Sequence, residues 1–221
     1  MPRKRRPLDR TSAVRSARLI VVATEDTKAT PQYLNDLAIK YQNTRVQLKV
    51  LERDSTASSP QHVLNQLREF VATYQIGADD ELWLVSDLDN WDVRMLSAVA
   101  RECLQSGFRL AISNPAIELW FLLHLIDLSD YDASTLERLR QNTKPSPKAT
   151  RTALEIEIVS KAGRYRKGRF HSADFLPYIQ TAIMNAKALD TNPADRWPQT
   201  LGTRMYQLIE SILESSTHYH R

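Results

Sequence analysis

Cysteine and glycine are scarce in this sequence of 221 residues, which contains 1 Cys and 5 Gly. A lone thiol at Cys103 cannot form a disulfide within the chain, and no combination of it with the 5 His has zinc-finger spacing. A Gly-rich Walker sequence is also missing, so any ATP hydrolysis must belong to a partner. The sequence therefore excludes a disulfide framework, a zinc finger and a P-loop ATPase, and it fits a reducing compartment.

Long hydrophobic runs are missing as well. The apolar run from Leu19 to Ala23 follows a basic segment but is far too short for a signal-peptide core or a membrane span. We therefore expect a cytoplasmic protein without a membrane partner. The hydrophobic share of 42% is that of an ordinary globular protein, and 221 residues suit one α/β domain carrying an extension.

Basic residues are concentrated in two segments, although the formal net charge is only +4. The first segment is residues 1–17, which we expect to form a flexible basic arm, and the second extends from Lys144 to Arg169. Clustered Lys and Arg can neutralise phosphates and release counterions, which favours nucleic acid as a partner. A solvated tail and a solvated helix face explain such clusters equally well.

Short apolar segments rich in β-branched residues alternate with segments of helical spacing in the first half of the chain. We predict strands over residues 18–24, 46–51, 81–86 and 108–113. We predict helices over residues 30–41, 60–74 and 93–106. This alternation predicts an α/β fold with a mostly parallel sheet flanked by helices, and ligands at the carboxyl ends of its strands.

The sequence after Ile117 has a mainly helical pattern. We predict a long helix through Trp120 and His124, a polar loop over residues 131–147, and later helices near residues 175–189 and 201–215. The predicted organisation is therefore a basic arm (1–17), an α/β core (18–125) and a mainly helical extension packed on that core (126–221).

Three acidic residues follow two of the predicted strands. Asp87 and Asp89 are alternate residues leaving the third strand, so their carboxylates can point the same way, and Glu25 follows the first strand. A divalent cation relieves the repulsion between close carboxylates, and hard oxygen ligands favour Mg²⁺ or Mn²⁺. The alternative is that such acids cap the following helices, which is the interpretation that we prefer for Asp92.

This arrangement resembles the Toprim domain of topoisomerases, primases and some nucleases, in which such acids bind magnesium. The chain more closely resembles the RloB-like family, a Toprim-related group encoded near restriction and phage-defence genes. Residues 25–33 resemble the family motif E-G-x-K-T-E-P-x-Y, which is kept at Glu25, Lys28, Pro31 and Tyr33. The chain departs from that motif at Asp26, which replaces glycine, and at Thr30, which replaces the second glutamate.

Three further motifs extend the resemblance over nearly the whole chain after the basic arm. Asp87 and Asp89 complete the D-x-D motif of the family. Residues 113–124 resemble S-N-P-x-x-E-L-W-x-L-L-H, which is the longest match, and residues 163–167 resemble G-x-Y-x-K.

The resemblance implies roles for five residues, and the positive charge of three more favours contact with phosphate. Glu25, Asp87 and Asp89 would be the metal ligands and, with Glu118, the catalytic residues. Nucleic acid would contact Lys28, Asn114, Arg166 and Lys167. Each contact residue has a structural alternative: a solvated loop lysine, a helix cap for Asn114, and an exposed linker for the last two. His124, which lies among Leu and Phe, is better explained as a hydrogen-bonded core residue than as a proton shuttle.

The leading hypothesis is a metal-dependent nuclease that hydrolyses DNA or RNA, including transfer RNA, with Mg²⁺ or Mn²⁺. The resemblance also implies an effector of prokaryotic antiviral defence by abortive infection, with a partner ATPase of the ABC or AAA type encoded nearby. Assembly into a homo-oligomer is compatible with this hypothesis. The alternative is a non-catalytic adaptor that binds nucleic acid or the ATPase and has a degenerate acidic site. A primase-type nucleotidyl transferase is more distant, because no nucleotide-selecting motif is present.

Overall fold

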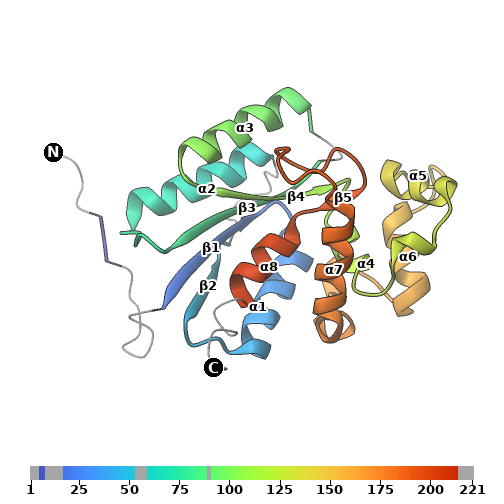
Figure 1. The fold of residues 1–221 in the computed structure, drawn as a ribbon, viewed down its shortest axis with the longest axis horizontal. Helices are drawn as coiled ribbons and strands as arrows, with labels where there is room; N and C mark the ends of the chain where they lie inside the picture. The colour runs from blue at the N-terminus through green and yellow to red at the C-terminus, as the bar shows by residue number, and fades with distance from the viewer. Residues whose placement is uncertain (1–4, 8–16, 53–58, 89–90, 214–221) are drawn as a thin grey trace.

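One five-stranded sheet forms the centre of the protein (Figure 1). The computed structural model describes residues 5–7, 17–52, 59–88 and 91–213. The strands are β1 (Arg18–Thr24), β2 (Val46–Val50), β3 (Glu81–Asp87), β4 (Arg109–Asn114) and β5 (Gly202–Thr203). Their order is β2-β1-β3-β4-β5, with β1 to β4 parallel and β5 antiparallel to β4. The predicted α/β fold with a mostly parallel sheet is therefore confirmed.

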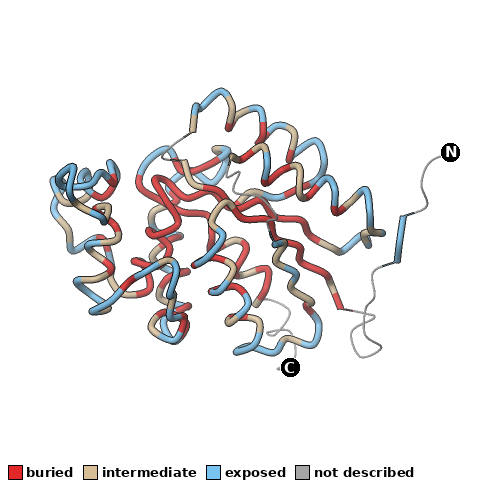
Figure 2. The backbone as a smooth tube through the Cα atoms, turned by 180° about the vertical axis from the view of Figure 1, so that it is seen from behind, coloured by how far each residue is buried: buried red, intermediate tan, exposed pale blue. Residues whose placement is uncertain are grey.

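Helices cover both faces of the sheet (Figure 1). One face carries α2 (Pro60–Thr73) and α3 (Val93–Gln105). The other face carries α1 (Ala29–Tyr41), α4 (Glu118–Leu122), α7 (Ile179–Leu189) and α8 (Met205–Leu213). The two remaining α-helices of the described residues, α5 (Ala133–Gln141) and α6 (Ala153–Ala162), lie at one side of the molecule beyond α4 and α7. The sheet is thus buried on both sides, as Figure 2 shows.

Burial on both faces explains why the strands were predictable as continuous apolar runs. Along β1, Leu19 and Val21 face α2 and α3, whereas Ile20 and Val22 face the other layer, and all four side chains are buried. The predicted bounds of the first four strands and first three helices agree with the structure to within one residue. The predicted cap is confirmed too, because the carboxylate of Asp92 accepts hydrogen bonds from the first turn of α3.

The second half of the chain differs from the prediction most in α4, α5 and α6. The long helix predicted through Trp120 and His124 is wrong, because α4 ends at Leu122. Residues 116–123 are all buried, so packing from every side replaces the one-sided pattern of a surface helix. The polar loop predicted over residues 131–147 is also wrong, since it contains α5, and α6 was not predicted.

Side-chain caps explain these two unpredicted helices. The Asp132 carboxylate accepts a hydrogen bond from the Thr135 backbone N–H at the start of α5, at 2.7 Å. The Glu155 carboxylate accepts a hydrogen bond from the Thr152 backbone N–H at the start of α6, at 2.9 Å. Each helix ends in a left-handed residue, Asn142 or Gly163. Local capping therefore stabilises helices whose apolar periodicity is weak.

The C-terminal part of the chain returns to the central sheet. Ser113 pairs with Thr203 and Asn114 pairs with Gly202, so β5 extends the sheet next to β4. A Cβ atom at residue 202 would lie 2.9 Å from the Cβ of Pro198, a close approach that requires glycine. Because β5 occupies residues 202–203, α8 begins at Met205 and not at residue 201 as predicted.

The predicted division at residues 17 and 125 stays a prediction. Most of the basic arm lies outside the described residues, and in its described part Arg6 forms an isolated parallel bridge with Tyr74. Within the described ranges, no helix combines the length and the apolar character that a membrane span requires.

Candidate functional site

The carboxyl ends of β1 and β3 form the switch point of the sheet, where the strand order reverses direction. From β1 the chain passes to β2 on one side and later to β3 on the other side. Glu25 directly follows β1, and Asp87 is the last residue of β3. Ligands of open α/β sheets bind in the crevice at such a point. The structure therefore brings these two predicted site residues together at the expected edge.

Three donors hold the carboxylate of Glu25. Its Oε2 accepts hydrogen bonds from the Ser86 hydroxyl at 2.6 Å and from the Asp87 backbone N–H at 3.3 Å. Its Oε1 accepts a hydrogen bond from the Trp91 indole N–H at 2.9 Å. Because the donors come from both sides of the β3 terminus, they fix the Glu25 carboxylate next to Asp87.

Asp87 connects the end of β3 to the loop before α4. Its Oδ1 accepts a hydrogen bond from the Ile117 backbone N–H at 2.8 Å. The next N–H, that of Leu88, lies 2.9 Å from the Ser113 carbonyl oxygen and 3.0 Å from that of Pro115. This loop therefore places Glu118, the residue after Ile117, close to the acidic pair.

The described donor set fits a weakly held Mg²⁺ or Mn²⁺. Within the described ranges, no group of three or more His, Cys, Asp and Glu side chains is arranged to hold a metal ion. The third predicted ligand, Asp89, lies outside those ranges. Mg²⁺ is commonly bound by only one or two carboxylates together with waters and substrate phosphates. Two hard carboxylates, Glu25 and Asp87, match that mode of binding.

Glu118 is a buried acid with two partners. Only 2% of its surface is exposed, and its Oε1 lies 2.6 Å from the Lys167 ammonium and 3.1 Å from the Tyr165 hydroxyl, which donates to it. Burial alone would lower the pKa of Lys167. The negative charge of Glu118, together with those of Asp87 and Asp26, has the larger effect, so the pKa of Lys167 is raised. Glu118 thus holds a permanent cation beside the acidic pair.

Removing the Lys167 charge tests this arrangement. Lys167→Met leaves the buried Glu118 carboxylate with the Tyr165 hydroxyl, so we expect the free energy of unfolding to fall by about 1–3 kcal/mol. Adding Glu118→Gln should recover most of that loss, because no uncompensated charge remains. Urea denaturation of the two single variants and the double variant measures the coupling. A loss no larger than that of the exposed control Lys148→Met would contradict the assigned pair.

The remaining predicted contact residues lie in three separate segments of the chain. Lys28 is exposed immediately before α1, and Arg166 is exposed in the segment before α7. Asn114 is only 8% exposed, and its amide donates a hydrogen bond to the Pro198 carbonyl oxygen at 2.9 Å. The structure therefore groups Lys167 with the acids, whereas Asn114 faces the segment before β5. Their roles in binding nucleic acid stay predictions.

His124 lies in the core, as the sequence indicated. Its side chain is 1% exposed, its Nε2 lies 3.0 Å from the Tyr33 hydroxyl, and its Nδ1 lies 2.8 Å from the Trp120 carbonyl oxygen. Because a carbonyl oxygen only accepts, Nδ1 carries the hydrogen and Nε2 accepts one from Tyr33. Burial lowers the pKa of His124 to about 4, so the ring is neutral near pH 7.

A family model described as RloB-like protein matches residues 20–212. The chain belongs to the RloB-like family. Comparison with curated proteins and with solved structures finds no match. The matched range contains every motif that carried the resemblance, from Glu25 to Lys167.

The two positions at which this RloB-like chain departs from the first motif contact each other. The Asp26 Oδ2 accepts hydrogen bonds from the Thr30 backbone N–H at 2.6 Å and from the Thr30 hydroxyl at 3.0 Å. Its Oδ1 accepts a third from the Lys28 backbone N–H at 3.0 Å. Lys28, the residue before α1, forms no side-chain cap, so Asp26 satisfies these N–H groups instead. The two replacements therefore act together as a helix cap.

Replacing Asp26 by the glycine of the family motif tests this interpretation. Asp26→Gly removes three hydrogen bonds and leaves the buried Thr30 hydroxyl without that acceptor, so we expect a loss of about 1–2 kcal/mol in the free energy of unfolding. Asp79→Gly, at an exposed turn, controls for the flexibility of glycine. Equal stability of the two variants in urea would show that Asp26 does not cap α1.

Several residues around this site of the RloB-like chain were not predicted. Ser86 and Trp91 orient Glu25. Their positions on either side of the D-x-D motif were the only sign of this role in the sequence. Arg151, Arg164 and Arg169 line a pocket together with Arg166. All four belong to the basic run between residues 144 and 169, but the run did not show which of its side chains converge.

Proposed function

We propose that this RloB-like chain is a metal-dependent nuclease of the Toprim type that hydrolyses phosphodiester bonds in DNA or RNA. The observation that carries the proposal is the acidic pair, Glu25 and Asp87, at the switch point of the sheet. The Lys167 ammonium lies beside this pair and can contact a phosphate. The same edge of the sheet thus carries acids that can bind a metal and a cation that can bind the nucleic-acid backbone.

The residues of the site have different roles in this proposal. Mg²⁺ or Mn²⁺ held by Glu25, Asp87 and Asp89 would supply Lewis acidity at the scissile phosphate and an activated water. Ser86 and Trp91 orient the Glu25 carboxylate. Lys167 binds a non-bridging phosphate oxygen, and Glu118 positions Lys167 from the buried side. Glu118 is a positioning residue in this account, although the family resemblance predicts a catalytic role for it.

A second candidate function is a non-catalytic adaptor for nucleic acid or for a partner ATPase. One feature favours it: Glu25 already accepts three hydrogen bonds, and Lys167 supplies positive charge to the same acidic edge. The acids and their partners then satisfy one another without a metal. In either case the setting that we propose is prokaryotic antiviral defence, with an ABC- or AAA-type ATPase as partner and assembly into a homo-oligomer.

A cleavage assay separates the two candidates. Purified protein is incubated with labelled plasmid, single-stranded DNA and total transfer RNA, with Mg²⁺, Mn²⁺ or EDTA, and with and without the neighbouring ATPase. The nuclease predicts fragments that depend on the divalent cation. Binding without fragments under every metal condition, with the ATPase present, would leave the adaptor as the better description.

A further inference from the structure

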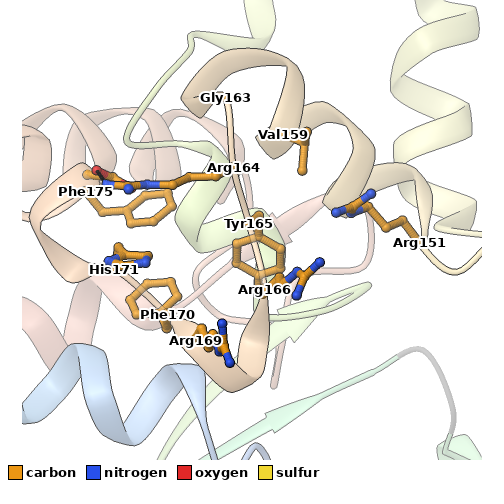
Figure 3. Close-up of a pocket in the computed structure, with 11 residues that line it drawn as sticks. Arg151, Val159, Gly163, Arg164, Tyr165, Arg166, Arg169, Phe170, His171 and Phe175 are labelled. Atoms are coloured by element: carbon orange, nitrogen blue, oxygen red, sulfur yellow. Dashed lines mark hydrogen bonds and ion pairs between the residues drawn. The ribbon is translucent and has the colours of Figure 1, made fainter.

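A pocket of about 300 Å³ lies next to the acidic site, and Figure 3 shows the side chains that line this pocket. Residues 163–171 separate the two regions and contribute to both. Tyr165 and Lys167 reach Glu118, whereas Arg164 and Arg166 line the pocket. The ring of Tyr165 also lines the pocket, so one side chain contacts both the pocket and the acidic site. A ligand in the pocket is therefore separated from Glu118 by a single residue.

Uncompensated positive charge surrounds the pocket. The side chains of Arg151, Arg166 and Arg169 make no ion pair and no hydrogen bond with any residue that the structure describes. Arg164 differs, because Asp174 binds its guanidinium through two hydrogen bonds of 2.8 and 2.9 Å. Asp174 is the only acid among the lining residues, so the other three guanidinium groups are available to an anion. Guanidinium groups bind phosphate with paired hydrogen bonds.

Aromatic rings form the other part of the lining. Phe170 is half-buried and packs parallel to the buried Phe175, with ring centroids 5.1 Å apart. Tyr165 lies edge-on to Phe170, with centroids 6.2 Å apart. These rings are held by the core beneath them and present an apolar wall beside the arginines in Figure 3. Aromatic rings next to free guanidinium groups are the combination by which proteins hold unpaired bases and their phosphates.

The size of the pocket limits the ligand. A volume of about 300 Å³ is at the lower end of sites for small molecules. It suits one nucleotide and leaves no room for a base pair with its two backbones. A duplex keeps the faces of its bases stacked and presents only base edges, sugars and phosphates, so its bases cannot stack on the aromatic wall.

We propose that this pocket binds one unpaired nucleotide of a nucleic-acid strand, with its phosphates on Arg151, Arg166 and Arg169 and its base against Tyr165 and Phe170. This proposal rests on the proposed nuclease function in one respect, namely that the bound strand continues from the pocket past Lys167 to the acids. It names the substrate class: strands, loops or overhangs with an unpaired nucleotide, rather than continuous duplex.

Binding without cleavage tests the pocket separately from the nuclease. Fluorescence anisotropy in EDTA compares a labelled single strand with the blunt duplex of the same sequence. We expect the single strand to bind at least about tenfold more tightly, since each stacked base contributes by itself about that factor. Equal affinity for the two forms would overturn the proposal.

Single substitutions identify the residues. Arg166→Ala and Arg169→Ala should each weaken single-strand binding about tenfold and reduce the slope of log affinity against log salt by about 0.7. Phe170→Leu, which keeps an apolar side chain, should weaken binding without changing that slope. The control Arg101→Ala removes the same charge from the exposed side of α3, and it should leave single-strand affinity unchanged. Arginine variants that bind like this control would contradict the pocket.

Three further measurements distinguish a failure of the pocket from a failure of the nuclease. Asp87→Asn should bind the single strand at least as tightly as the wild type in EDTA, because it leaves the pocket intact and removes a negative charge from the path of the strand. If Asp87→Asn keeps this binding but loses cleavage, both proposals are supported. If the wild type cleaves duplex and single strand at equal rates, only the pocket proposal is overturned. Competition by a nucleoside monophosphate but not by inorganic phosphate supports base recognition, and equal competition by both overturns it.

Discussion

Asp87→Asn is expected to reduce metal-dependent cleavage by about a thousandfold while the protein stays folded. Asparagine keeps the size of the side chain and an oxygen that can accept the hydrogen bond from the Ile117 N–H. It removes the negative charge that strengthens the binding of a divalent cation. A thousandfold loss corresponds to about 4 kcal/mol of transition-state stabilisation, which is in the range that metal ions supply. Single-turnover cleavage with excess protein measures this loss directly.

The same substitution at Asp92 is the matched control. Asp92 lies five residues further along the chain and caps α3 through the backbone N–H groups of Arg94 and Met95. Asparagine caps helices about as well as aspartate does. Asp92→Asn should therefore keep both full cleavage and full stability. Cleavage by Asp87→Asn at the wild-type rate would exclude Asp87 as a metal ligand.

The free energy of unfolding is expected to fall by about 3 kcal/mol between pH 6.5 and pH 4 through His124 alone. An unperturbed His has a pKa of about 6.5 in the unfolded chain, whereas burial lowers the pKa of His124 to about 4 in the folded protein. Between these values the unfolded chain binds more protons, so stability decreases as the pH falls through this window. Well above pH 6.5 the ring is neutral in both states and its contribution is constant.

Urea denaturation across this pH range tests the prediction. His124→Gln should be less stable at pH 7, because the bonds to Tyr33 and Trp120 are disturbed, but its stability should depend less on pH between 6.5 and 4. The exposed His62 provides the control, and His62→Gln should keep the wild-type dependence. If His124→Gln kept that dependence as well, another group would be responsible for it.

The first half of the fold was predictable because its helices and strands are defined by local patterns. β1 and β3 are buried on both faces and therefore read as continuous apolar runs, and caps such as Asp92 mark helix starts. In the second half, the helices predicted near residues 175–189 and 201–215 correspond to α7 and α8, but α4, α5 and α6 were not predictable in this way. Only Leu139 of α5 is buried, so this helix has almost no apolar stripe. In contrast, all five residues of α4 are buried, which removes the periodic pattern.

The candidate site divides in the same manner. The proximity of Glu25 to Asp87 was predictable, because parallel strands end at the same edge of a sheet. The contact between Glu118 and Lys167 joins residues 49 positions apart through the packing of α4 against the segment after α6, which no local pattern contains. The pocket beside Tyr165 likewise depends on arginines from separate elements. Motifs therefore located the acids and Lys167, and only the tertiary structure showed that Lys167 contacts Glu118 and which arginines converge on the pocket.

The pairing of β4 with β5 has a consequence for synthesis of the chain. Thr203 meets Ser113 in the sheet but is made 90 residues later. Until residues 202–203 leave the ribosome, the carboxyl end of β4 exposes backbone N–H and C=O groups that can pair with another nascent chain. The acidic edge is thus built next to an open strand, and the risk of aggregation continues until the C-terminal segments close it.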